Sequence, residues 1–269
     1  MVSAMWGGTW DVRRFDEIDS TNAYLRREAR RGAPEGTAAV AEHQSAGRGR
    51  MDRRWEAPPG ASLLASVLFR PDFDPAELHL CTAAMALAAV EACRQVAGVE
   101  PDVKWPNDLL VGEAKLAGIL AEAEFEGASC ALVVGIGLNV DWPGPAGVGG
   151  TCLRDVMSSR SSAAPPAPPA PPAPPAPPAP PDRLLLLNAL LGGLSTRRGL
   201  LDSAPGRRQV AAELRDRCVT PGKRVRVTLA SEEVLGMATE IDDAGQLVVH
   251  TDAGPRTVSA GDVVHLRPA

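Results

Sequence analysis

The hydrophobic and polar positions of the N-terminal region alternate between periods typical of strands and of helices. Residues 10–15, 36–42 and 61–69 are short apolar or alternating runs, which predict strands. Between the first two, Ser20 is a good N-cap and Gly32 a natural helix end, so a helix is expected there. The region should therefore contribute strands and one helix to an α/β fold.

The middle of the chain is expected to complete the same sheet. Residues 74–97 predict a long helix closed by Gly98. Residues 116–125 alternate glutamates such as Glu122 with alanines, so we expect a strand with the glutamates on a wet face and the alanines buried. Residues 131–140 are apolar on both faces and predict a central strand antiparallel to it.

The next segment contains a low-complexity insertion. Within the insertion 163–181, residues 165–181 repeat Pro-Pro-Ala, which predicts a polyproline II excursion on the surface; it is either inert or a docking site for a partner. Asp182 then caps a leucine-rich helix over residues 183–191, which Gly192 and Gly193 should end. A further helix is expected around residues 207–217.

The C-terminal segment has a different pattern. Five short alternating runs predict a small SH3-like barrel of five strands. These runs are residues 224–229, 234–241, 246–251, 256–258 and 263–266. The sequence therefore predicts a catalytic domain over residues 1–218, which contains the proline-rich insertion, and a C-terminal domain over residues 219–269.

Composition narrows the function classes. The chain has 269 residues and a net charge of −5, which argues against nucleic-acid or membrane binding through bulk charge. The five cysteines contain no CxxC pair and the four histidines show no ligand spacing, so neither a zinc site nor a disulfide framework is expected. No segment reads as a signal peptide, and residues 1–18 are too few for a helix-turn-helix module. We expect a cytoplasmic protein that binds no DNA.

The basic residues are unevenly chosen. Of 28 basic residues only three are lysines, and two of these, Lys104 and Lys115, lie close together. This choice indicates positions that need a compact ammonium group, although chance placement is the alternative.

A glycine-arginine run is the strongest candidate for chemistry. Gly47-Arg48-Gly49-Arg50 cannot pack as core, and its guanidinium groups suit phosphate or carboxylate oxygens. We expect residues 47–54 to form a loop that closes around an anion and varies when no ligand is bound; a solvated hairpin loop is the alternative. Similarly, the polar triplet that begins at Ser20 either caps its helix or also holds a ligand.

Five motifs in this order and spacing resemble the biotin protein ligase family. They are Ser20-Thr21-Asn22, the run from Glu42 to Arg50 with Trp55, Lys104-Trp105-Pro106-Asn107-Asp108, Lys115-Leu116-Ala117-Gly118-Ile119-Leu120 and Gly135-Ile136-Gly137-Leu138-Asn139. The small C-terminal module is also similar to that of the family. The resemblance implies a mixed sheet like that of class II aminoacyl-tRNA synthetases. It is closest to the monofunctional type without a DNA-binding domain.

The resemblance also implies ATP, biotin and Mg²⁺, with biotinyl-5′-AMP as the intermediate and a biotin carboxyl carrier protein as acceptor. It implies catalytic roles for Lys115, Arg48 and Arg50, and no metal ligands from the chain. The implied substrate-binding residues are Ser20, Thr21, Asn22, Gln44, Gly47, Arg48, Gly49, Arg50, Arg53, Trp55, Lys115, Gly118, Gly135 and Asn139. We expect no membrane association, and a monomer or weak homodimer.

Other functions would require sequence motifs that can be compared with this chain. A lipoate ligase or octanoyltransferase would share the fold and chemistry, but the glycine-rich loop with an adjacent His-Asp is not found. A nucleotide-dependent oxidoreductase would need GxGxxG, and the third glycine is replaced by Asp52 in one run and by Val140 in the other. A non-catalytic module would use the arginines only to capture an anion. One departure from the family is Met51-Asp52, which places an acid beside the expected phosphate site.

Overall fold

The computed structural model describes residues 10–127, 129–162, 179–229 and 231–266. A seven-stranded sheet has the order β1-β2-β3-β7-β6-β5-β4. Strands β1 and β2 pair in parallel, and the other neighbours are antiparallel. The strands are β1 (Asp11–Ile18), β2 (Thr37–Gln44), β3 (Ser62–Phe69), β4 (Asp102–Lys104), β5 (Asp108–Val111), β6 (Ala114–Glu126) and β7 (Ser129–Asn139). The predicted mixed sheet is confirmed.

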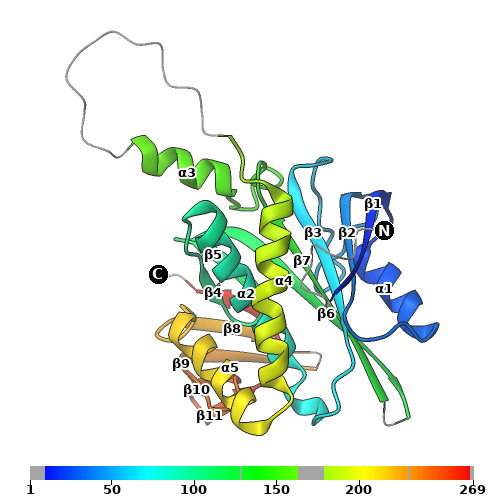
Figure 1. Ribbon diagram of the computed structural model, residues 1–269. Coiled ribbons are helices and arrows are strands. Elements are labelled where there is room, and N and C mark those ends of the chain that lie inside the picture. Colours follow the sequence, from blue (N-terminus) through cyan, green and yellow to red (C-terminus); the bar gives the residue numbers. More distant parts are fainter. Residues whose placement is uncertain (1–9, 128, 163–178, 230, 267–269) are drawn as a thin grey trace.

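Helices cover both faces of this sheet (Figure 1). Helix α1 (Thr21–Arg30) packs on one face, against β2, β3 and β7. On the other face lie α2 (His79–Ala97), preceded by a 3-10 turn, and α4 (Arg183–Leu201), followed by α5 (Ala204–Arg217). The sheet is therefore the middle of three layers.

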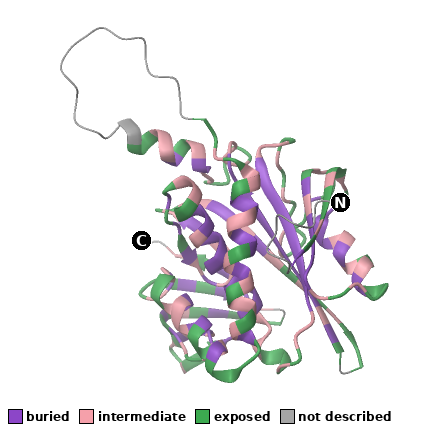
Figure 2. Cartoon of the chain, in the orientation of Figure 1, coloured by how far each residue is buried: buried purple, intermediate pink, exposed green. Residues whose placement is uncertain are grey.

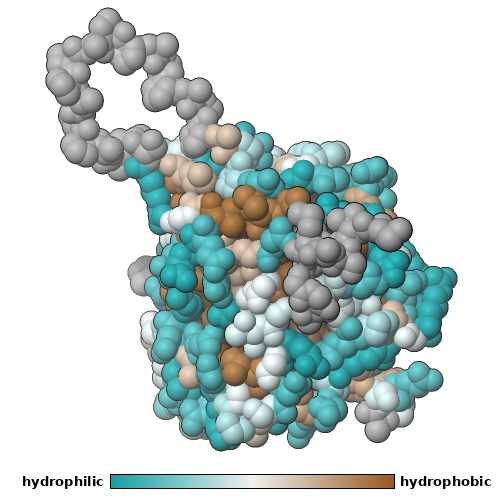
Figure 3. Space-filling view, viewed as in Figure 1, coloured by the Kyte–Doolittle hydropathy of each residue, from teal (hydrophilic) through white to brown (hydrophobic). Residues whose placement is uncertain are grey.

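The face of the molecule seen in Figure 3 is largely hydrophilic, with hydrophobic side chains gathered over the first turns of α4.

The core lies between the large sheet and α2, and β3 is buried along its whole length (Figure 2). Pro75–Ala97 is long and apolar enough to cross a membrane by length and composition, yet 72% of its most apolar stretch is buried inside the protein. Many of its residues are alanines, which let it lie close to the sheet and to α4. Helix α2 is thus the central helix of a packed domain.

The predicted C-terminal barrel is a five-stranded antiparallel sheet of order β11-β10-β9-β8-β12, consistent with an SH3-like fold. Its strands are β8 (Arg224–Thr228), β9 (Glu233–Ile241), β10 (Leu247–Thr251), β11 (Gly254–Val258) and β12 (Asp262–His265). Trp105 joins it to the large sheet, because its backbone N–H donates to Thr220 Oγ1 at 3.0 Å and its indole N–H to the carbonyl of Gly245 at 3.2 Å. The two sheets share one hydrophobic core. The domain boundary at residue 218 stays a prediction.

One sequence expectation about helices was wrong, and one helix was missed. Helix α4 continues through Gly192 and Gly193 to Leu201, because it packs on α2, with Gly193 beside Ala88. The burial gained by this packing outweighs the poor helix propensity of the two glycines. Helix α3 (Leu153–Ser162) was not expected at all.

The wet and buried faces of β6 are also reversed from the prediction. Glu122 and Glu124 are only 15% and 21% exposed in their side chains, because α1 covers that face and supplies Arg26 and Arg30 as ion-pair partners. Phe125, on the opposite face, is 56% exposed. The Pro-Pro-Ala tract lies almost entirely outside the described residues, which resume at position 179.

Candidate functional site

A cavity of about 330 Å³ opens above the middle of the large sheet. All of the predicted substrate-binding residues line it except Gly47. Further lining residues come from the loop 143–150, and Asp262 of the C-terminal sheet also lines the cavity. The five sequence motifs therefore meet at one place, and the binding roles assigned to them remain predictions.

Residues 47–55 form a short hairpin, called here the arginine hairpin. Arg48 and Arg54 form an antiparallel bridge, and the N–H of Gly49 donates to the carbonyl of Arg53 at 2.7 Å. Gly47 is needed for backbone packing, because a Cβ there would lie 2.2 Å from the carbonyl oxygen of Trp55. The role of Gly47 is therefore to let the two arms of the hairpin approach each other.

One end of the cavity is a network of neutral polar groups at the start of α1. Thr21 donates its N–H and hydroxyl to Gln44 Oε1 at 2.7 and 3.0 Å. Ser66 lies 2.7 Å from the Thr21 hydroxyl and donates to Asn22 Oδ1 at 2.6 Å. Ser20 caps the helix through the N–H of Ala23. These side chains both cap α1 and present buried donors and acceptors to the cavity.

Glycines form the floor of the cavity. Gly118 and Gly137 face each other in β6 and β7, and the indole of Trp55 lies against both. A Cβ on Gly137 would lie 2.3 Å from the ring, and one on Gly135 would lie 2.0 Å from Asn22 Oδ1. The strands thus use glycine where a ring and an amide approach the backbone.

Two buried polar atoms beside this floor have no hydrogen-bond partner within the described part of the chain. They are the indole nitrogen of Trp55 and the side-chain oxygen of Asn139, whose amide nitrogen donates to the carbonyl of Thr151 at 3.0 Å. Buried polar groups are normally paired, so a donor and an acceptor are both available here to a ligand.

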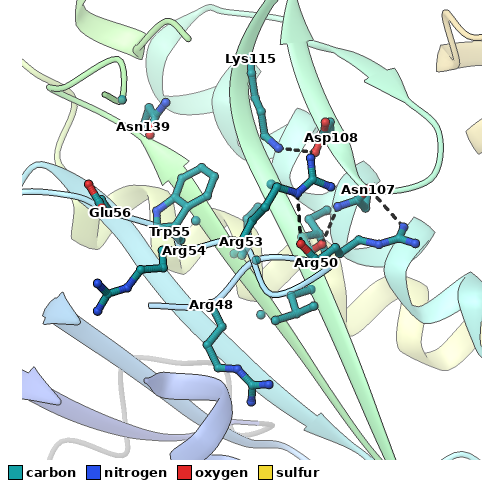
Figure 4. Close-up of a pocket in the computed structure, with 18 of the residues that line it drawn as sticks. Arg48, Arg50, Arg53, Arg54, Trp55, Glu56, Asn107, Asp108, Lys115 and Asn139 are labelled. Atoms are coloured by element: carbon teal, nitrogen blue, oxygen red, sulfur yellow. Dashed lines mark hydrogen bonds and ion pairs between the residues drawn. The ribbon is translucent and has the colours of Figure 1, made fainter. Parts of the chain in front are cut away.

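The other end of the cavity is cationic (Figure 4). Lys115 Nζ donates to Asp108 Oδ1 at 2.6 Å, and Lys104 Nζ lies 4.0 Å from the other oxygen of this carboxylate. Burial lowers the pKa of Lys104, while Asp108 opposes that shift. Lys115 Nζ also lies 5.9 Å from the centroid of the Trp55 ring. The two lysines singled out in the sequence thus flank one carboxylate.

The arginines of the hairpin point in different directions. Arg50 Nη1 donates to Asn107 Oδ1 at 3.4 Å, and burial lowers the pKa of Arg50. Arg48 points away from Lys115 and Asp108, and pairs with Glu122 at 2.9 Å (Figure 4). Arg53 pairs with Asp262. Arg48 and Arg50 therefore do not form one cluster.

Several lining residues were not in the predicted set. Asn107 and Asp108 belong to a motif that the sequence showed, so their chemistry could have been inferred from it. Gly137 is part of the glycine motif on β7. Asp262 follows the arginine hairpin by about two hundred positions, and no local pattern announces it.

The comparisons with known proteins agree with this geometry. Residues 15–139 match the biotin/lipoate A/B protein ligase family, and residues 220–266 match the biotin protein ligase C-terminal domain. The chain is 38% identical to a biotin–acetyl-CoA-carboxylase ligase of Mycobacterium tuberculosis, over 97% of this chain and 91% of the relative. It is 30% identical to the corresponding ligase of Paracoccus denitrificans, over 91% and 96%.

The fold is also similar to that of solved structures. A biotin protein ligase of Aquifex aeolicus, in complex with biotin and ATP, superposes with a TM-score of 0.75 at 22% identity. The match covers 96% of this chain and 99% of the other.

Proposed function

Because the chain belongs to the biotin protein ligase family, we propose that it activates biotin with ATP and transfers it to a lysine of a biotin carboxyl carrier protein. As a member of this family it is an enzyme that ligates biotin. The observation that carries the assignment of roles is a single cavity with a neutral polar end, a glycine floor and a cationic end.

In the first step, a carboxylate oxygen of biotin attacks the α-phosphorus of ATP. The new O–P bond forms as the bond to pyrophosphate breaks, which gives biotinyl-5′-AMP. Both reactants are anions, so most of the catalysis is positioning and fixed positive charge. Lys115 and Arg50 lie at the cationic end and are proposed to stabilise the phosphoryl oxygens, with Asp108 holding Lys115 in place.

The neutral end suits the ureido group of biotin, which offers both donors and acceptors. Ser20 and Thr21 present buried hydroxyl groups there, and Gln44 adds a half-buried amide. Neutral partners fit a neutral ligand group, because a buried charge would be left without compensation. Trp55, lying on the glycine floor, is proposed to cover the apolar part of the ligand.

The nucleotide base is assigned to the side of the cavity near Asn139. Its unpaired Oδ1 would accept from the exocyclic amine of adenine. Glycine and proline residues of loop 143–150 line the same part of the cavity. Arg48, held by Glu122 at 2.9 Å, is proposed to join the ligand only after leaving that carboxylate.

In the second step, the amine of a carrier lysine attacks the activated carbonyl carbon. The C–N bond forms, the bond to AMP breaks, and the amine loses a proton. A mixed anhydride also hydrolyses, so the arginine hairpin is proposed to exclude water until the carrier arrives.

Biotin is favoured over lipoate because the C-terminal sheet matches the biotin protein ligase C-terminal domain. Isothermal titration separates the two ligands. Biotin should bind and lipoate should not, and the reverse result would assign the chain to the lipoate branch.

The test of the proposed function is pyrophosphate release from ATP in the presence of biotin. Lys115→Ala is expected to lower this rate on the order of 10²- to 10³-fold, because it removes positive charge from the developing phosphate charge. Lys223→Ala is the matched control, since Lys223 is exposed and outside the cavity. Equal rates for both variants would contradict the assignment.

The metal ion, the cellular location and the oligomeric state are also proposed. Mg²⁺ is proposed to enter as MgATP, because Mg²⁺ in nucleotide sites is held largely by substrate phosphates. A cytoplasmic location is supported by the five cysteines, all of which are free. A monomer or weak homodimer is proposed as the working form, with no DNA target.

A further inference from the structure

One acidic side chain of the C-terminal sheet lines the cavity. Asp262 is the first residue of β12, and the side chain of the next residue, Val263, is buried in the core. Successive residues of a strand face opposite sides, so Asp262 is directed out of the core and toward the cavity. A carboxylate beside a site for phosphate repels the ligand, and its presence requires another explanation.

The partner of Asp262 is Arg53 of the arginine hairpin. Arg53 Nη2 lies 2.5 Å from Asp262 Oδ1, although 209 positions separate the residues. The side chain of Asp262 is 25% exposed and that of Arg53 is 59% exposed. The pair thus joins the arginine hairpin to the C-terminal sheet beside the cavity and neutralises the carboxylate there.

Arg53 also makes hydrogen bonds within the hairpin. Its Nε donates to the carbonyl of Arg50 at 3.1 Å, and its own carbonyl accepts from Gly49 at 2.7 Å. A contact made by Arg53 is therefore transmitted to the whole hairpin. Asp262 therefore contacts the hairpin at a side chain that is itself hydrogen-bonded to another residue of the hairpin.

We propose that Asp262 is a positioning residue, which holds the arginine hairpin closed over the cavity through Arg53 and so protects the activated acyl group from water. The inference rests on the proposed function for its chemical consequence. When the hairpin opens, water attacks the acyl carbon and the bond to AMP breaks, which releases free biotin and AMP. The contact between Arg53 and Asp262 itself involves no ligand.

The first experiment measures hairpin closure without substrates. Hydrogen exchange of residues 47–55 is compared between the full-length protein and Asp262→Asn. Exchange should become roughly two- to fivefold faster in the variant, the size expected from a partly exposed ion pair. At high salt, exchange in the unmodified protein should approach the rate seen in Asp262→Asn, because salt screens such ion pairs.

The matched control is Asp243→Asn. Asp243 also belongs to the C-terminal half and pairs with an arginine of the other domain, Arg215, at 2.7 Å, but it does not line the cavity. This variant should leave exchange of residues 47–55 unchanged. Asp262→Glu should restore slow exchange, since it keeps the carboxylate.

The second experiment measures the chemical consequence. With ATP, biotin and limiting carrier protein, Asp262→Asn should release more AMP per biotinylated carrier than the unmodified protein. Its KM for ATP should not rise, since the substitution removes a negative charge from the site of an anionic substrate. A rise in KM for ATP without extra AMP would indicate a substrate-binding role instead and would overturn the proposal.

A double-mutant cycle completes the test. Arg53→Ala and Asp262→Ala should each speed exchange, and the double variant should exchange no faster than Arg53→Ala alone. Additive effects would mean that the two side chains act separately. If the protein releases no pyrophosphate from ATP and biotin, the proposed function fails, whereas unchanged exchange in Asp262→Asn refutes the closure alone.

Discussion

Gly137 shows how a missing side chain shapes the cavity. Glycine weakens a strand, yet β7 places one opposite Gly118 of β6 in the middle of the large sheet. The space is filled by the indole of Trp55, and a Cβ on Gly137 would lie 2.3 Å from the ring. The position is therefore set by contact with Trp55 and not by the strand.

Gly137→Ala is expected to displace Trp55 and lower kcat/KM for biotin on the order of 10- to 100-fold, since small misplacements in a site have such effects. Steady-state kinetics with pyrophosphate detection checks this. Gly192→Ala is the matched control, because that helical glycine faces open space and alanine should stabilise α4 by about 1 kcal/mol without changing activity. Wild-type kinetics for Gly137→Ala would refute the role of the floor.

At the scale of the element, the arginine hairpin contains local strain. Met51 and Asp52 at its tip have φ values of 53° and 57°, in the left-handed region. A two-residue turn with both residues in this region is the type I′ turn, which strongly prefers Asn-Gly. The unusual Met51-Asp52 pair therefore makes the closed hairpin less stable than it could be.

Replacing the tip by Met51→Asn with Asp52→Gly should relieve about 1 kcal/mol of this strain and slow hydrogen exchange of residues 47–55 about fivefold. Mass spectrometry of peptides from this region is the measurement. Asp52→Ala serves as the control, because it removes the acid but keeps a side chain at a left-handed position. Exchange that is equal or faster in the double variant would show that the tip is not strained in solution.

Helix and strand errors show where local patterns are insufficient. The predicted end of α4 at Gly192 failed because packing on α2, which is remote in sequence, keeps Gly193 helical. The wet and buried faces of β6 were exchanged because Arg26 of α1 turns Glu122 into an inward ion-pair partner. In both cases the deciding contact came from another element.

For the whole molecule, most of the helices and strands and the convergence of the motifs could be predicted from sequence, whereas α3 could not. Caps, glycines and alternation are local signals. As expected, Ser20 begins α1 and Gly98 ends α2. Asp262 could not be predicted, because only the packing of the C-terminal sheet brings it to Arg53. The contribution of one domain to the site of another is a tertiary property.

The junction between the sheets also predicts how stability depends on pH. His265 of β12 lies there, 3.2 Å from Thr220 Oγ1. Burial, and then Lys104 and Lys223, lower its pKa from 6.5 to about 4. In the folded protein His265 thus stays neutral over a range in which the unfolded chain takes up a proton. Since the unfolded state binds more protons between these values, stability falls as the pH decreases from about 6.5 toward 4.

We therefore expect His265→Gln to lose less stability than the unmodified protein on acidification. Between pH 7.5 and pH 5 the difference should be about 1 kcal/mol, after allowance for the partial exposure of the ring. Urea unfolding at both pH values measures it, with His250→Gln on the exposed side of β10 as the matched control. His265 joins β12 to Thr220, which also accepts from the backbone of Trp105. If His265→Gln and the unmodified protein lose the same stability on acidification, protonation of His265 does not couple the C-terminal sheet to the rest of the fold.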